Sequence, residues 1–137
     1  MKLCSACLLG INCRYKGDNK LNQKVLDLLG KEMLIPVCPE QLGGLMTPRN
    51  PGELNEGRVI DNHGGDQTNN IVLGITEAMK LVELYDIKEA VLKQKSPTCG
   101  CGKIYDGTFS GKLIDGDGLF TKALKEKGIN VISEEEL

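Results

Sequence analysis

Cysteines are the residues in this 137-residue sequence that could do the most chemistry, since there are six of them and only one histidine. Cys7, Cys38 and Cys99 each lie at the carboxyl end of a different apolar segment that reads as a short strand. In a parallel sheet these ends meet at one edge, where ligand sites form. Three thiolates held together without a cation are costly, so the spacing predicts a metal centre.

The number of ligands leaves two kinds of metal centre open. A structural zinc ion normally has four protein ligands, and His63 could supply the fourth from a long loop. A cubane iron-sulfur cluster held by three cysteines instead leaves one iron accessible, which suits catalysis. The alternative without metal is that Cys7, Cys38 and Cys99 are inert buried thiols, because free cysteine packs like a small apolar residue.

The other three cysteines, Cys4, Cys13 and Cys101, are interpreted as packing or incidental thiols. Cys101 lies two residues from Cys99, so a spare ligand or a sulfur relay is its alternative role. Cys4 and Cys7 form a Cys-x-x-Cys pair, but such redox pairs begin helices, whereas this one lies in a strand-like segment. A thioredoxin-like redox site is therefore not favoured.

Composition and charge exclude several classes of protein. Hydrophobic residues make up 40% and charged residues 26%, which is typical of a globular domain, and the net charge is -2. No basic stripe marks a polymeric nucleic-acid binder, and two Phe, three Tyr and no Trp make a platform for single-stranded nucleic acid unfavourable. No signal peptide or membrane span is evident, so we expect a cytoplasmic protein with reduced thiols and no membrane partner.

The elements that must position the cysteines follow from hydrophobic periodicity and from Gly and Pro breakers. Strands are expected at residues 1–9, 33–37, 90–92 and 129–132, and helices at 21–29, 71–82 and 120–124. Residues 43–65 read as an ordered loop, with a hairpin as an option, and 105–118 as a loop-rich stretch. This alternation predicts an α/β protein: a small three-layer Rossmann-like fold with a mainly parallel sheet of about four strands flanked by helices. We expect a single domain spanning residues 1–137.

Seven short strings occur in order along the chain: Ser5-Ala6-Cys7-Leu8-Leu9-Gly10, Cys13-Arg14-Tyr15, Val37-Cys38-Pro39-Glu40, Gly43-Gly44-Leu45, Thr47-Pro48-Arg49, Ser96-Pro97-Thr98-Cys99-Gly100 and Tyr105-Asp106-Gly107-Thr108-Phe109. Each string alone is weak, but together they make the whole chain resemble the short single-domain family that contains the 2-thiouracil desulfidases. Cys4, Lys16 and Gln67 depart from the family pattern, and none of them is an expected ligand or catalyst.

The resemblance implies a 4Fe-4S cluster ligated by Cys7, Cys38 and Cys99, with one iron not bound by the protein. That iron would take the sulfur of a thiolated pyrimidine, a 2-thiouracil or 4-thiouracil type base or nucleoside. Glu40 and Ser96 match the family's acid/base residues, which implies a hydrolytic, non-redox reaction giving the oxo base and sulfide. From the residues alone, Glu40 could instead charge a helix N-terminus and Ser96 could be a turn residue.

Two other functions stay open beside this one. Desulfidation of thiolated tRNA would need a nucleotide-sized groove with local positive charge, to which Arg14 and Arg49 could contribute. Alternatively, the chain could be a non-catalytic iron-sulfur or zinc protein that stores or senses sulfide. The sequence leaves open the thiocarbonyl position, the sulfide acceptor and the oligomeric state.

Overall fold

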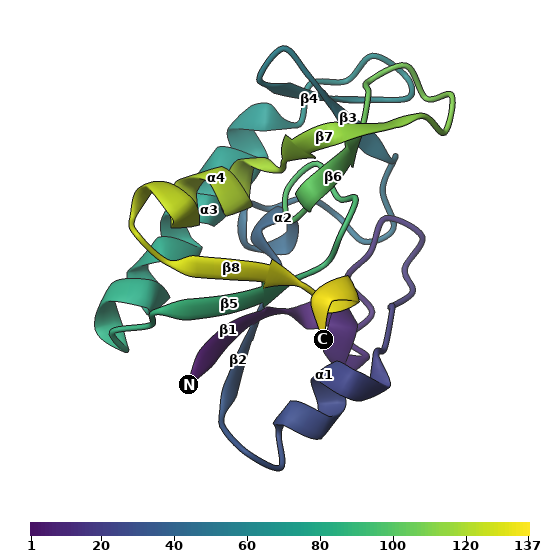
Figure 1. Cartoon of the computed structure of the whole chain (residues 1–137). Helices are drawn as coiled ribbons and strands as arrows, with labels where there is room; N and C mark the ends of the chain where they lie inside the picture. The colour runs from purple at the N-terminus through teal and green to yellow at the C-terminus, as the bar shows by residue number, and fades with distance from the viewer.

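A four-stranded parallel sheet forms the centre of the computed structural model, which describes residues 1–137 (Figure 1). Its strands, in spatial order, are β2 (Leu34–Val37), β1 (Lys2–Ser5), β5 (Glu89–Leu92) and β8 (Asn130–Ser133). The helices are α1 (Gln23–Leu28), α2 (Pro39–Leu42), α3 (Thr68–Leu84) and α4 (Leu119–Glu126), and the 3-10 helices are η1 (Ala6–Leu9) and η2 (Glu134–Glu136). The predicted α/β class and four-stranded parallel sheet are confirmed.

Both faces of the sheet are covered, because successive strand residues point to opposite sides. Leu3 packs into a cluster of 18 buried residues with α3 and α4, while its neighbour Cys4 packs into a separate cluster of eight with α1 and η1. In β5, Ala90 and Leu92 likewise belong to the larger cluster and Val91 to the smaller one. The result is the expected three layers, with α3 and α4 on one side and α1 on the other (Figure 1).

Two hairpins lie outside the sheet. The first joins β3 (Gly52–Asn55) to β4 (Arg58–Asp61), within the segment where a hairpin was an option. The second joins β6 (Cys101–Tyr105), where no element was predicted, to β7 (Leu113–Asp117), which lies in the stretch expected to be loop-rich. Its strands were missed because β7 is mostly exposed and lacks the apolar alternation that marks a half-buried strand.

Two element boundaries differ from the sequence prediction. The first strand ends at Ser5, and residues 6–9 form η1, so Cys7 lies just beyond the strand rather than within it. The first helix begins at Gln23, because the Asn22 side chain accepts a hydrogen bond from the backbone N–H of Val25 at 3.2 Å and caps it. Leu21, expected on the helix, is exposed in the preceding loop.

Helices α2 and α3 approach each other through two glycines. A Cβ on Gly74 would lie 1.6 Å from the carbonyl oxygen of Pro39, and one on Gly43 would lie 1.7 Å from that of Asn70. Only glycine fits at both positions. This close contact fixes the segment that carries Cys38 and Glu40 against the longest helix.

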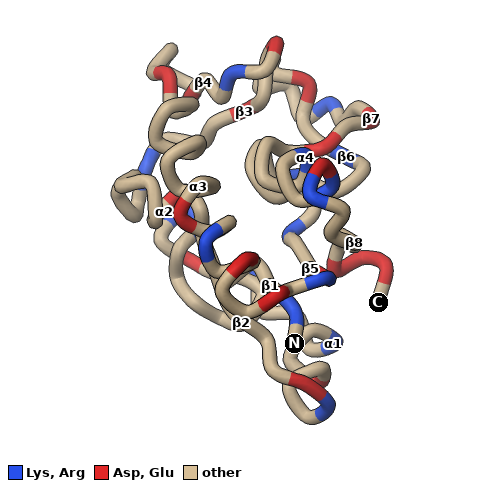
Figure 2. Tube along the Cα trace, turned by 90° about the vertical axis from the view of Figure 1, so that its left-hand side faces the viewer, with Lys and Arg blue, Asp and Glu red and all other residues tan.

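Acidic and basic residues are interspersed along the chain, and no basic stripe forms (Figure 2). No helix has the length and apolar character that crossing a bilayer demands. All six cysteines are free thiols.

Candidate active site

A pocket of about 570 Å³ opens beyond the carboxyl ends of β1, β2 and β5, the edge where parallel sheets place their ligands. Cys7 reaches it from η1, Cys38 directly after β2, and Cys99 from the loop after β5. The three cysteines thus line one cavity, although 92 positions separate the first from the last in sequence (99 − 7). A volume of this size lies within the range of small-molecule sites, roughly 300–1,000 Å³.

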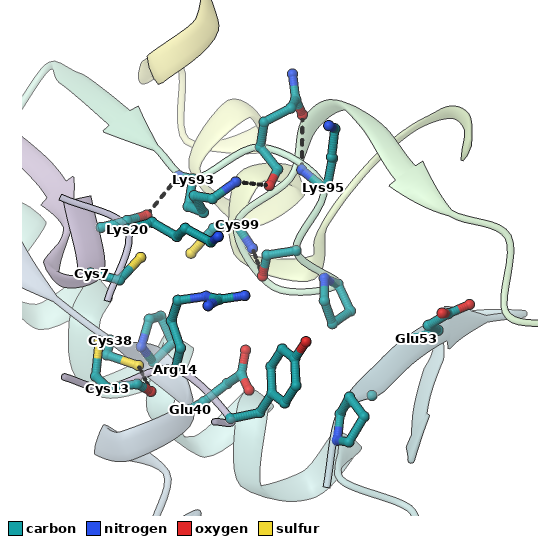
Figure 3. Close-up of a pocket in the computed structure, with 18 of the residues that line it drawn as sticks. Cys7, Cys13, Arg14, Lys20, Cys38, Glu40, Glu53, Lys93, Lys95 and Cys99 are labelled. Atoms are coloured by element: carbon teal, nitrogen blue, oxygen red, sulfur yellow. Dashed lines mark hydrogen bonds between the residues drawn. The ribbon is translucent and has the colours of Figure 1, made fainter. Parts of the chain in front are cut away.

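A fourth cysteine, Cys13, lines the same pocket. It is 2% exposed, and its backbone carbonyl lies 3.8 Å from the Sγ atom of Cys38. Figure 3 shows the Cys13 and Cys38 side chains next to each other, with Cys7 and Cys99 on the same side of the pocket. Cys13 thus packs in the smaller hydrophobic cluster, in keeping with the packing role expected for it, and it also lines the pocket.

Burial and mutual contact disfavour ionised thiols here. The hydrogen bond with Cys13, together with burial, raises the pKa of Cys38 well above its ordinary value, and burial does the same for Cys99. At Cys13 the hydrogen bond with Cys38 lowers the pKa, but that with Cys7 and burial outweigh it and raise the pKa to about 11. Without a cation these thiols stay protonated, so a metal group must displace their protons when it binds.

The chemistry of the donors fits an iron-sulfur cluster better than a single ion. Thiolate sulfur is a soft ligand that suits iron-sulfur clusters and zinc. No three Cys, His, Asp or Glu side chains converge closely enough to hold one metal ion. A cluster presents its iron atoms at separate corners, so its ligands need only surround a cavity, as Cys7, Cys38 and Cys99 do. His63 is exposed outside the pocket, which leaves a Cys3His zinc site without its fourth ligand.

The carboxylate of Glu40 is held in one orientation at the pocket wall. Its Oε1 atom accepts a hydrogen bond from Arg49 Nε at 3.0 Å, and its Oε2 atom accepts one from Thr98 Oγ1 at 2.9 Å. Arg49 is itself fixed, because its Nη2 atom donates to the carbonyl of Cys13 at 2.9 Å. Charged hydrogen bonds of this kind are among the stronger ones in proteins, so Glu40 is preorganised.

Ser96 both lines the pocket and shapes the loop that carries Cys99. Its Oγ atom accepts hydrogen bonds from the backbone N–H groups of Thr98 at 3.1 Å and Cys99 at 3.0 Å. Ser96 thus stabilises the turn that leads to Cys99, which is the alternative role expected for it. Because the oxygen is the acceptor in both bonds, the hydroxyl proton is not used by either of them.

Basic side chains outnumber acidic ones around the cavity: the lining contains Arg14, Lys20, Arg49, Lys93 and Lys95, but only Glu40 and Glu53 as acids. Lys93 pairs with the buried Glu134 at 3.1 Å. Arg14 likewise pairs with Asp18 at 2.7 Å, and Lys95 lies 3.9 Å from Glu135. Lys20 is therefore the one basic lining residue without an acidic partner. Its amino group extends into the pocket towards Cys99 (Figure 3).

Sequence reasoning missed Thr98 as well as Cys13. Thr98 is fully buried and reaches Glu40 across 58 positions of sequence. The only feature of the sequence that pointed to Thr98 was its position between Pro97 and Cys99 in the string Ser96-Pro97-Thr98-Cys99-Gly100. Cys4 and Cys101 also lie in the two hydrophobic clusters but do not line the pocket, which fits the packing role expected for them.

Comparison with known proteins gives three findings. The family model described as 2-thiouracil desulfurase matches residues 3–136. The uncharacterized Bacillus subtilis (strain 168) protein YbbK is 38% identical over 147 residues, which cover 100% of this chain and 97% of YbbK. A solved structure of the 4Fe-4S-dependent thiouracil desulfidase TudS superimposes with a TM-score of 0.93 at 38% identity, covering 99% of this chain and 91% of the other.

Proposed function

Because this chain belongs to the 2-thiouracil desulfurase family, we propose that it removes sulfur from a thiolated pyrimidine, a 2-thiouracil or 4-thiouracil type base or nucleoside. The reaction would consume one water and release the oxo base and hydrogen sulfide, with no net change in oxidation state. The observation that carries the proposal is that Cys7, Cys38, Cys99, Glu40 and Ser96 line one pocket.

In this proposal Cys7, Cys38 and Cys99 hold a 4Fe-4S cluster whose fourth iron has no protein ligand. When bound, the cluster would supply a Lewis acid that polarises the carbon–sulfur bond of the substrate. The free thiols and the cavity between them support this assignment, as does the cluster dependence of the similar TudS enzyme.

Glu40 would act as the acid/base residue. Its carboxylate accepts two hydrogen bonds, from Arg49 and Thr98, and each oxygen keeps lone pairs for a further partner. It can therefore take a proton from the attacking water and return one to a ring nitrogen.

Ser96 would orient that water. Its oxygen accepts hydrogen bonds from two backbone N–H groups, so the hydroxyl proton is left to donate a hydrogen bond to a water in the pocket that Ser96 lines. A fixed donor restricts the approach of the water to one direction, which lowers the entropic part of the barrier.

The decisive experiment is anaerobic iron and labile-sulfide analysis, followed by turnover assays with 2-thiouracil and 4-thiouracil. We expect about four irons per chain, loss of the thiocarbonyl absorbance, and no turnover in Cys99→Ala. Stoichiometric zinc, or a full cluster without turnover on any thiolated base or nucleoside, would contradict the proposal and favour a protein that stores or senses sulfide.

Glu40→Gln separates catalysis from sensing. The amide keeps the shape and the contact with Thr98 but cannot accept a proton, so turnover should fall at least about 100-fold while the cluster is retained. A sensor would keep its metal-dependent behaviour unchanged in this variant.

The unpaired Lys20 in the pocket lining supports a second candidate, desulfidation of thiolated tRNA or its nucleotide fragments. Its amino group would bind a phosphate next to the base. In that case Lys20→Ala should weaken catalysis on a thiolated nucleotide but leave catalysis on the free thiolated base unchanged. Equal effects on both substrates would remove the support for this candidate.

We further propose that residues 1–137 act as a single desulfidase-like domain in the cytoplasm. The family match over residues 3–136 supports the single domain. The six unpaired cysteines support the cytoplasmic location, since thiols persist in a reducing compartment.

A further inference from the structure

Aromatic side chains are scarce in this chain but are concentrated at the pocket. Of the three tyrosines and two phenylalanines, Tyr15, Tyr105 and Phe109 line the cavity. The other two lie elsewhere: Phe120 is fully buried in the core, and Tyr85 is exposed at the end of α3. The pocket therefore contains three of the five aromatic residues of the chain.

Phe109 is presented to the pocket by an unusual backbone. It lies in the loop between β6 and β7 with a φ of 56°, in the left-handed region that bulky side chains rarely adopt. The residue is 40% exposed, so full burial of the ring does not compensate for this strain. Strain of this kind persists only where surrounding contacts impose it, and it is concentrated at functional sites.

The surrounding contact is made by Glu53 on β3. Its Oε1 atom accepts hydrogen bonds from the backbone N–H groups of both Gly107 and Phe109, each at 3.1 Å. The loop is stiffened further because Asp106 Oδ1 accepts hydrogen bonds from the backbone N–H and the hydroxyl of Thr108. Glu53 lies across the pocket from the cysteines (Figure 3), so its two hydrogen bonds hold the β6–β7 loop opposite the proposed cluster.

We propose that Phe109 stacks on the pyrimidine ring of the substrate, and that Glu53 is a positioning residue that holds Phe109 in place. The inference rests on the proposed function, since it names the surface that binds the base. A flat ring against the face of the pyrimidine would leave the sulfur directed at the cysteines and the ring nitrogens accessible to Glu40. Stacking recognises aromaticity, so the site should prefer an aromatic thiobase to a puckered one.

The test uses the cluster-loaded protein, with Phe109→Leu and Phe109→Tyr as the main variants. Phe109→Leu should raise KM for 2-thiouracil about tenfold, with kcat changed less than about threefold, and should weaken uracil binding in calorimetry by a similar factor. Phe109→Tyr should restore both values. For 5,6-dihydro-2-thiouracil, which has no aromatic ring, Phe109→Leu should change KM less than about twofold.

Glu53 and a remote aromatic residue provide the matched variants. Glu53→Ala should raise KM in the same direction as Phe109→Leu, and Glu53→Gln, which keeps an acceptor oxygen, should restore most of the affinity. Tyr85→Leu removes an exposed ring outside the pocket and should leave KM and uracil binding unchanged.

Unchanged KM and uracil affinity in Phe109→Leu, or an equal loss for the aromatic and dihydro substrates, would overturn the stacking proposal. If the loaded wild type bound uracil in a Phe109-dependent manner but desulfidated nothing, stacking would stand and the proposed reaction would fall. Wild-type protein that bound no pyrimidine would overturn both.

Discussion

At the scale of single residues, the polar side chains of the site are held in place by hydrogen bonds. Glu40 lies between Arg49 and Thr98, and the Ser96 hydroxyl oxygen receives two backbone hydrogen bonds. Preorganised polar groups of this kind cost nothing to reorient during a reaction, which is why they stabilise developing charge more effectively than water does.

Thr98→Val tests whether the orientation of Glu40 matters. Valine has nearly the shape of threonine but cannot donate a hydrogen bond, so Glu40 Oε2 loses its partner. Hydrogen bonds to charged groups contribute about 1.5–3 kcal/mol, so we expect kcat/KM for the thiolated base to fall at least about tenfold. Cluster content should not change, and Thr98→Ser, which keeps the hydroxyl, should remain close to wild type.

The four cysteines of the pocket allow the proposed ligand set to be tested one thiol at a time. Cys7→Ala, Cys38→Ala and Cys99→Ala should each reduce the iron content sharply. Cys13→Ala should retain it, because its thiol is a neighbour rather than a ligand in the proposed set, and Cys101→Ala is the control for a buried thiol outside the pocket. Loss of iron in Cys13→Ala, with retention in one of the first three, would reassign the ligands.

At the scale of elements, the contact between α2 and α3 positions one side of the site. Helix α2 is only four residues long, and it follows directly on Cys38. Its own hydrogen bonds cannot fix it, because short helices are marginal without tertiary packing. Gly43 and Gly74 provide that packing by letting the two backbones touch.

Gly74→Ala should disrupt this arrangement. The new methyl would lie 1.6 Å from the Pro39 carbonyl oxygen, so the helices must separate and carry Cys38 and Glu40 with them. We expect the free energy of unfolding to fall by at least about 2 kcal/mol, and the iron content to fall as well. Denaturant titration and iron analysis measure these effects. Leu73→Ala, at the exposed neighbouring position, should change stability by less than about 0.5 kcal/mol.

At the scale of the whole molecule, most of the core lies outside the proposed cluster site. Of the 18 and eight buried residues in the two clusters, five also line the pocket: Ala6, Cys7, Cys13, Val37 and Cys99. The fold should therefore persist without metal. The cluster would still add stability, because it joins segments that follow three different strands.

Removal of the cluster by oxidation and chelation should leave the far-UV circular dichroism spectrum unchanged. It should lower the thermal midpoint by roughly 10 °C if the cluster contributes about 3 kcal/mol. Calorimetry of the loaded and cluster-free forms would measure the shift. Complete unfolding of the cluster-free chain would instead show that the core is insufficient by itself.

The sequence by itself determined the features that local patterns encode. Apolar segments separated by breakers predicted four parallel strands, and the fact that Cys7, Cys38 and Cys99 follow strands predicted that they line one edge. The carboxyl ends of parallel strands lie at the same edge of a sheet whatever the order of the strands, so these predictions did not depend on details of packing.

Only the tertiary structure decided what surrounds those cysteines. Cys13 and Thr98 reach the site through irregular loops, whose sequences have no hydrophobic periodicity. Glu53 in one hairpin accepts a hydrogen bond from the backbone of Phe109 in the other, 56 positions later in the sequence. Contacts of this kind depend on how loops cross one another in space. A local pattern does not encode such crossings, because each loop conformation is set by partners far away in the sequence.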